Sequence, residues 1–132
     1  MKNIEWKPML LQFIPRVIVA FILAQTLFFK FTAAEESIQI FATLGMEPWG
    51  RIGIGVIELV AVLLLLSRYY IVGAIISLSV ISAANFLHFA KLGIEINNDG
   101  GALFAMSVVV IFLSVWLVYY WNRLRPNSLL PT

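Results

Sequence analysis

The chain has 132 residues, of which 61% are hydrophobic and 12% charged, and its formal net charge is +2. Soluble domains average about 45–50% apolar and about 25% charged residues, so residues 1–132 indicate a single integral membrane domain. The absence of cysteine excludes disulfides and thiolate metal sites, and the small net charge gives no reason to expect nucleic acid as a partner.

Four apolar stretches dominate the chain, over residues 9–32, 50–66, 70–90 and 102–121. At about 1.5 Å per residue, stretches of this length approach or exceed the hydrocarbon core of roughly 30 Å. We therefore expect an all-α, four-helix up-down-up-down transmembrane bundle. Pro15 would fall in the first turns of the first helix, where proline is tolerated. A cleaved signal peptide is the competing interpretation of that stretch, but three later spans favour a polytopic protein.

Residues 33–48, between the first two apolar stretches, have the pattern of a short amphipathic helix. Its apolar residues recur at helical spacing while its polar residues fall largely on the other side, with Ile38, Phe41 and Leu44 set against Glu35, Glu36 and Gln39. We expect this helix to lie at the membrane surface and to end at Gly45 and Pro48. Further along, Asp99 is well placed to cap the last helix.

The basic residues predict the orientation. Four spans place both termini on one face, with six basic residues, Lys2, Lys7, Arg16, Arg68, Arg123 and Arg125; the opposite face has three, Lys30, Arg51 and Lys91. Cytoplasmic loops and tails carry an excess of lysine and arginine. Both termini are therefore expected in the cytoplasm.

Glu58 is a carboxylate well inside the second apolar stretch. Ionisable groups in hydrocarbon cost at least about 2.5–3.5 kcal/mol and normally face a partner inside the bundle. From the helix rise, Glu58 lies about 12 Å below the expected outer face, Gln25 about 10 Å and Asn85 about 8 Å. Lys30 and His88 lie within about 3 Å of that face. This shared depth predicts a polar pocket in the outer half of the bundle.

The third apolar stretch carries a polar stripe of its own, in which Ser79, Ser82, Asn85 and His88 recur at every third residue. Lipid offers such groups no hydrogen-bond partners, so the stripe is expected to face other helices or a wet cavity. A lone histidine without cysteine favours neither a zinc nor a haem site, and no metal is expected.

Structural roles stay open for several of these residues. Lys30 can extend to the interface or reach Glu58, and a Lys30–Glu58 pair can serve stability alone. Arg16 suits either a lipid-headgroup anchor or a residue that pairs two helices.

Several motifs occur together in one order along the chain. They are Arg16 early in the first stretch, the exit Leu27-Phe28-Phe29-Lys30-Phe31, the pair Leu44-Gly45, the run Ile57-Glu58-Leu59, and His88 late in the third stretch. From about Gln12 to Trp121 the pattern resembles the DoxX family of small four-helix bacterial membrane proteins, which includes DoxD-like and MauE-like relatives. Leu27 stands where that family usually has glycine, in a G-x-x-K arrangement.

The resemblance implies a multi-pass protein of the bacterial inner membrane. Some relatives serve membrane redox systems, notably a thiosulfate:quinone oxidoreductase subunit, and others act as accessory factors for partner proteins. The leading hypothesis is therefore a quinone-linked redox subunit whose pocket binds a quinone ring, with Glu58 or His88 exchanging its proton. The alternatives are a non-catalytic assembly factor for a client protein and a small transporter. Membrane lipid, a redox or client protein and further copies of the chain are the expected partners.

Overall fold

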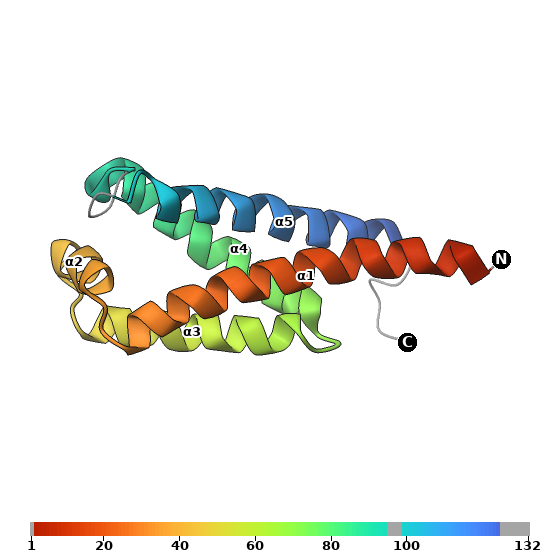
Figure 1. The fold of residues 1–132 in the computed structure, drawn as a ribbon, viewed down its shortest axis with the longest axis horizontal. Helices are drawn as coiled ribbons and strands as arrows, with labels where there is room; N and C mark the ends of the chain where they lie inside the picture. Colours follow the sequence, from red (N-terminus) through yellow and green to blue (C-terminus); the bar gives the residue numbers. More distant parts are fainter. Residues whose placement is uncertain (1, 95–98, 125–132) are drawn as a thin grey trace.

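The computed structural model describes residues 2–94 and 99–124, and the side chains of residues 10–94 and 99–123. Every secondary-structure element of the described residues is a helix, and none of them is a strand. Their elements are α1 (Lys2–Phe31), α2 (Glu35–Thr43), α3 (Trp49–Leu65), α4 (Tyr70–Leu87), the π-helical turn η1 (His88–Leu92) and α5 (Ala102–Leu124), as Figure 1 shows. The prediction of an all-α protein is confirmed.

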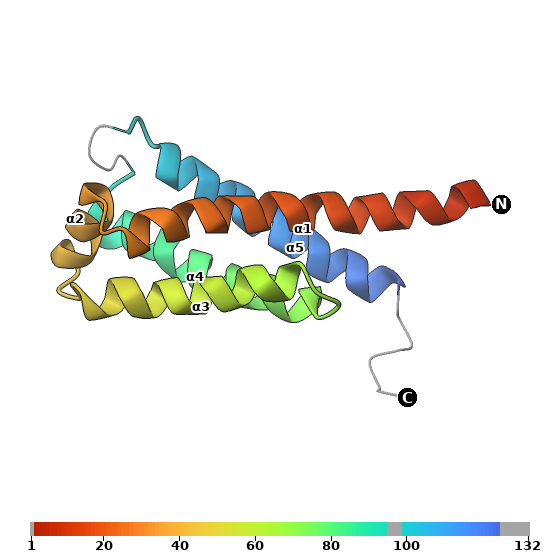
Figure 2. The same cartoon turned by 60° about the horizontal axis from the view of Figure 1, so that its bottom comes forward.

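The four longer helices lie roughly along one axis and pack in the cyclic order α1, α3, α4, α5 and back to α1. Figures 1 and 2 show that α2 and η1 gather at one end of this assembly, whereas the N-terminus of α1 extends beyond the other. We call these the α2 end and the turn end, the latter after the short α3–α4 connection at residues 66–69. The apolar clusters of the four helices form one core between them.

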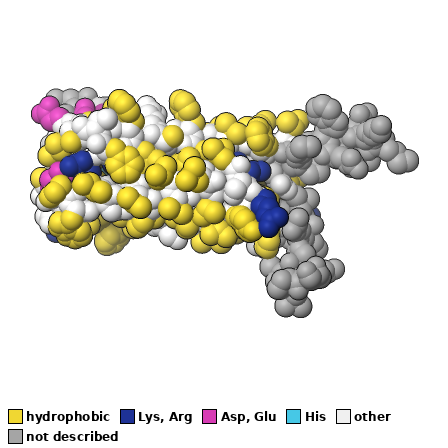
Figure 3. Space-filling model, turned by 90° about the horizontal axis from the view of Figure 1, so that it is seen from below, with side chains coloured by type: hydrophobic (Ala, Val, Ile, Leu, Met, Phe, Trp, Pro, Cys, Tyr) yellow, Lys and Arg dark blue, Asp and Glu magenta, His cyan; other side chains and the backbone are white. Residues whose placement is uncertain are grey.

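Three helices are long and apolar enough to cross a membrane, over Leu10–Phe31, Tyr70–Leu92 and Ala102–Arg123. Large apolar side chains also cover the outside, and Phe112 is 71% exposed. Figure 3 shows hydrophobic side chains along the length of one face, with charged side chains mainly near its ends. These features indicate a membrane protein.

The second predicted span is shorter than the other three. α3 has 17 residues, which at about 1.5 Å per residue make about 26 Å, against a hydrocarbon core of about 30 Å. A fourth crossing therefore stays a prediction. So does the orientation, because the side chains of Lys2, Lys7 and Arg125 lie outside the described residues.

Glycine permits close contact between α3 and α4 at the turn end. A Cβ atom on Gly73 would lie 2.8 Å from the backbone nitrogen of Leu65 and 2.9 Å from the carbonyl oxygen of Ala61. Real Cβ atoms do not approach backbone atoms this closely, so a larger residue at position 73 would push the helices apart. Leu65 and Ala74, on either side of this contact, are fully buried.

Pro15 lies in the interior of α1, because the helix begins at Lys2 and not near Met9 as the sequence suggested. Proline has no N–H group, so it cannot donate to the carbonyl four residues earlier, that of Leu11. The indole Nε1 of Trp116 on α5 donates to this carbonyl at 3.1 Å. The hydrogen bond that Pro15 removes within α1 is thus replaced by one between α1 and α5.

Candidate functional site

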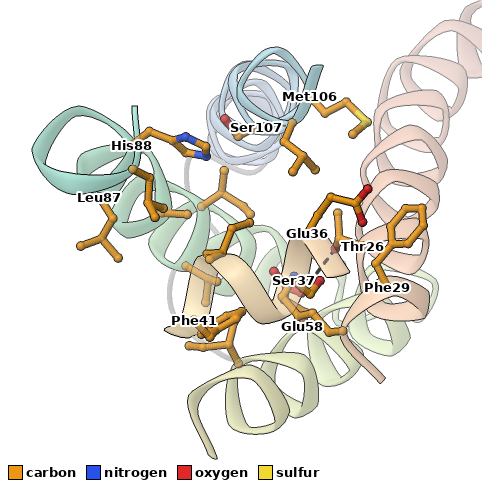
Figure 4. Close-up of a pocket in the computed structure, with 18 of the residues that line it drawn as sticks. Thr26, Phe29, Glu36, Ser37, Phe41, Glu58, Leu87, His88, Met106 and Ser107 are labelled. Carbon is orange, nitrogen blue, oxygen red and sulfur yellow. Dashed lines mark hydrogen bonds and ion pairs between the residues drawn. The ribbon is translucent and has the colours of Figure 1, made fainter. Parts of the chain in front are cut away.

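A cavity of about 360 Å³ lies at the α2 end of the molecule, and all five α-helices contribute to its wall. The wall is mostly apolar, and its polar side chains are Thr26, Lys30, Glu36, Ser37, Glu58, His88, Asp99 and Ser107 (Figure 4). Small-molecule sites are typically concave, largely apolar spaces of about 300–1,000 Å³ with a few placed polar groups. The cavity has the size and the composition of such a site.

Lys30 and Glu58 meet at the wall of this cavity. The Nζ atom of Lys30 lies 2.9 Å from Oε2 of Glu58, with side-chain exposures of 13% and 4%. The Thr26 hydroxyl is 3.4 Å from the same carboxylate oxygen and 2.8 Å from the carbonyl oxygen of Leu23. The Lys30 side chain therefore reaches the buried acid and does not extend only toward water. A buried charge without a partner is costly, so each member of this pair compensates the burial of the other.

Gln25 lies outside the cavity, contrary to the prediction, and its side chain is exposed. Residues three and four apart share one face of a helix. Leu23, Thr26 and Lys30 follow that spacing and line the cavity together, whereas Gln25 is five residues before Lys30 and points elsewhere. Thr26 stands four residues before Lys30, and this spacing in the sequence would have predicted that the two side chains share one helix face.

His88 begins the π-helical turn and is 6% exposed. Its Nδ1 lies 2.7 Å from the carbonyl oxygen of Gly93, and its ring meets the ring of Phe104 edge-on with centroids 5.6 Å apart. Gly93 has φ 79°, which favours glycine, and its conformation brings this carbonyl back to the ring. π-Helical turns often occur at functional sites. Figure 4 shows the His88 ring directed into the space between α4 and α5.

Asn85 belongs to a contact between α4 and α5 and does not line the cavity. Its Oδ1 accepts a hydrogen bond from the hydroxyl of Ser107, which does line the cavity. The remainder of the predicted polar stripe turns outward: Ser79 and Ser82 are exposed, and Ser79 donates to the carbonyl of Ile75 at 2.9 Å. A repeat of three residues drifts around a helix of 3.6 residues per turn, so the stripe does not stay on one face.

α2 covers the cavity with Phe41 and Leu44 of its expected apolar face, but not with Ile38. Ser37 and Phe41 are buried, whereas Ile38 is 37% exposed. Ile40 and Glu36 also line the cavity, and Figure 4 shows the Glu36 carboxylate directed from α2 toward α1. The helix ends before Gly45, whose φ of 73° favours glycine, as the sequence indicated.

Arg51 is a residue whose role the sequence analysis missed. It is 7% exposed, donates from Nε to both carboxylate oxygens of Glu47 at 3.0 Å, and donates from Nη1 to the carbonyl of Lys30. The last carbonyls of a helix lack partners within it and carry partial negative charge. Arg51 therefore caps the end of α1 and holds the backbone of Lys30. It stands seven residues before Glu58, on the same helix face, and that spacing was the available signal.

Arg16 makes the corresponding contact at the turn end and is remote from the cavity. Its Nε donates to the carbonyl of Leu65 at 2.7 Å and its Nη2 to the carbonyl of Ser67 at 2.9 Å. Its guanidinium lies 4.5 Å from the ring centroid of Tyr70. The sequence left two roles open for Arg16, a lipid-headgroup anchor and a residue that pairs two helices. These contacts are those of a residue that pairs two helices.

Asp99 caps α5, as the sequence indicated. Its Oδ1 accepts from the backbone nitrogen of Gly101 at 2.8 Å and its Oδ2 from that of Leu103 at 3.1 Å. Within the described residues, no group of three or more histidine, aspartate or glutamate side chains is arranged to hold a metal ion.

Comparisons with family models, with curated proteins and with solved structures find no match to this chain. The resemblance to the DoxX family therefore rests on the sequence motifs, and the function has to be argued from the cavity itself.

Proposed function

We propose that the protein is a DoxX-like subunit of a redox system in the bacterial inner membrane, and that its cavity binds the ring of a quinone-type lipid. The observation that carries this proposal is the cavity of about 360 Å³, which combines an apolar wall with the Lys30–Glu58 pair and His88. A quinone-type lipid has the same combination, because a polar ring is joined to an apolar tail. The tail would lie among the apolar side chains and the ring against the polar ones.

The proposal includes four crossings of the membrane, by α1, α3, α4 and α5, with cytoplasmic termini. The packing of α3 between α1 and α4 supports its inclusion, since an outward face of α3 is as apolar as those of its neighbours. Arg16 also supplies partners for carbonyls at the end of α3. Backbone groups at membrane depth need such partners because lipid has none. In this orientation the α2 end faces the outer side of the membrane.

Lys30, Glu58 and His88 have distinct roles in this function. Nδ1 of His88 is held by the Gly93 carbonyl, which leaves Nε2 for a ligand in the cavity that His88 lines. Lys30 pairs with Glu58 and holds its carboxylate at the wall of the cavity. Glu58 or His88 then exchanges a proton with the bound ring or with water, while a redox partner protein exchanges the electrons. A bound quinone supplies the reversible two-electron, two-proton chemistry.

A pair of substitutions, one on α4 and one on η1, tests whether the cavity is the binding site. Ala84 lines the cavity, whereas Ala90 is exposed and does not. Ala84→Phe is expected to fill the cavity and to abolish saturable binding of a short-tailed quinone by the purified protein in lipid nanodiscs. Ala90→Phe adds the same side chain outside the cavity and should bind as the wild type does. Equal binding by two folded variants, or no saturable binding by the wild type, would overturn the proposal.

A second function, a non-catalytic assembly factor, is favoured by the closeness of the Lys30–Glu58 contact. At 2.9 Å and largely buried, the pair joins α1 to α3 directly and can serve stability alone. Replacing a buried ion pair by apolar residues of similar volume is often neutral or stabilising. The double variant Lys30→Met/Glu58→Leu should then keep a client protein bound during co-purification. A redox subunit would instead lose its proton-linked activity in the same variant.

A further inference from the structure

His88 presents a hydrogen-bond acceptor to the cavity. A carbonyl oxygen only accepts hydrogen bonds, so at 2.7 Å from the Gly93 carbonyl the Nδ1 atom must carry the proton. In the neutral ring, Nε2 then has a lone pair and no hydrogen. Among the described residues nothing donates to Nε2, although the side chain is 6% exposed. Nε2 is not among the buried atoms that lack a partner, so it is accessible, and a ligand in the cavity that His88 lines can donate to it.

The other charged groups of the wall add acceptors. Two carboxylates, those of Glu36 and Glu58, line the cavity with a single ammonium, that of Lys30. The third carboxylate of the wall, Asp99, is already occupied by the backbone N–H groups of Gly101 and Leu103. Glu58 uses Oε2 for its contacts with Lys30 and Thr26, which leaves Oε1 for a ligand. Among the described side chains no cation pairs with Glu36. The charge of the wall therefore opposes a ligand whose polar atoms are carbonyl oxygens.

Donors of the wall are mostly committed to protein acceptors. The Lys30 ammonium is held by Glu58 at 2.9 Å. The Thr26 hydroxyl donates to Leu23 at 2.8 Å, and the Ser107 hydroxyl has Asn85 and Phe104 as its acceptors. The Ser37 hydroxyl can serve as a donor or as an acceptor. The cavity thus offers a ligand more acceptors than donors.

The geometry points to a ligand that donates hydrogen bonds, and so to the hydroxyl-bearing, reduced form of the ring in preference to the quinone. This inference rests on the proposed function and specifies which form of the ligand the cavity selects. A hydroquinone places O–H groups where His88 Nε2 and the free oxygens of Glu58 and Glu36 accept them. A quinone places carbonyl oxygens against the same acceptors and leaves them unsatisfied.

Three ligands with one ring and one short alkyl tail test the inference: the hydroquinone, the quinone and the dimethyl ether of the hydroquinone. The ether keeps the shape but cannot donate. Their dissociation constants are measured without oxygen, by calorimetry on the full chain in nanodiscs. We expect the hydroquinone to bind about tenfold more tightly than either other ligand. Equal binding of all three would overturn the inference and leave the proposed function standing, whereas failure of all three to bind would overturn both.

Variants then identify the acceptors. His88→Ala is expected to remove most of the preference for the hydroquinone over its ether, and His88→Gln, which retains a side-chain acceptor, to restore part of it. Glu36→Gln, at an exposed residue of α2 that lines the cavity, should weaken the preference by a smaller factor and gives a second readout if position 88 tolerates no change. Gln25→Ala, outside the cavity, is the matched control. An unchanged preference in folded His88→Ala and Glu36→Gln proteins would overturn the inference.

Discussion

The two ends of the molecule share one kind of contact but differ in how closely their helices pack. At each end an arginine of one helix donates to the C-terminal carbonyls of its neighbour: Arg16 of α1 at the end of α3, and Arg51 of α3 at the end of α1. At the turn end, four residues connect α3 to α4 and Gly73 lets the helices touch. At the α2 end, longer connections and a π-helical turn separate the helices, and a cavity lies between them.

The comparison shows that the arginine contacts alone do not determine how tightly the helices close. Both satisfy helix-end carbonyls that would otherwise lack partners. The difference arises from the side chains between the helices, glycine and alanine at the turn end and a buried ion pair with an aromatic-lined space at the α2 end. Both regions are expected to contribute to stability, whereas ligand recognition is expected only at the α2 end. Four sets of substitutions test these roles, in decreasing order of the expected change in stability.

The largest effect is expected from separating the ion pair at the α2 end. Lys30→Met alone leaves Glu58 as an unpaired buried charge, which should cost about 3–5 kcal/mol of unfolding free energy. The double variant Lys30→Met/Glu58→Leu should recover most of that loss. Reversible unfolding in mixed micelles measures both. A single variant as stable as the double one would show that the pair carries no such penalty.

Removal of the arginine at the turn end is expected to have the next largest effect. Arg16→Leu deletes two hydrogen bonds from a charged donor to the end of α3 and should cost about 2–3 kcal/mol. Ligand binding at the distant α2 end should stay unchanged, because effects at separated sites are usually independent. Unfolding curves and calorimetric titration of one preparation give both quantities. A parallel loss of ligand binding would mean that the two ends are coupled.

Gly73→Ala and Gly53→Ala form a matched pair, because each substitution adds one Cβ atom to a glycine within a helix. Gly73→Ala places a Cβ against the backbone of α3 and should cost about 1–3 kcal/mol. Gly53→Ala meets no atom within 4 Å, and should instead stabilise the protein by about 0.4–1 kcal/mol through the unfolded chain. Thermal unfolding of both variants measures the difference. Equal effects would show that the α3–α4 contact is looser than described.

The smallest effect concerns the hydrogen bond that compensates for Pro15. Trp116→Phe removes the donor to the Leu11 carbonyl and should cost about 0.5–1.5 kcal/mol. In a Pro15→Ala background the N–H of residue 15 can bond that carbonyl again, so the same substitution should cost less. A double-mutant cycle of unfolding free energies measures the difference. Additive costs of the two substitutions would show that the hydrogen bond from Trp116 does not compensate for Pro15.

Local patterns in the sequence predicted the helices well. The bounds of the second span, the short helix before Gly45 and the capping role of Asp99 agree with the structure within a few residues. These features depend on composition and on neighbouring residues, which the sequence contains. The start of α1 was misplaced because the first residues are polar, although they continue the helix of the apolar stretch.

The identity of the cavity residues was only partly predictable. Lys30, Glu58 and His88 were selected because a charged or titratable group in an apolar stretch needs a partner, and they do line one cavity. Gln25 was selected on its depth, and Asn85 on its depth and on the polar stripe of its helix; the first side chain is exposed and the second meets Ser107. Depth follows from the helix rise, but the facing direction depends on how each helix is rotated against its neighbours.

The class of the protein, its helical elements and the need of one buried acid for a partner could thus be inferred from the amino-acid sequence. All three follow from hydropathy, periodicity and the cost of a charge away from water. Only the tertiary structure decided that Thr26 accompanies Lys30, that Arg51 holds the end of α1 and that Glu36 of α2 faces the cavity. The physical reason is that side-chain packing between helices sets their rotation, and that packing joins residues far apart in the chain.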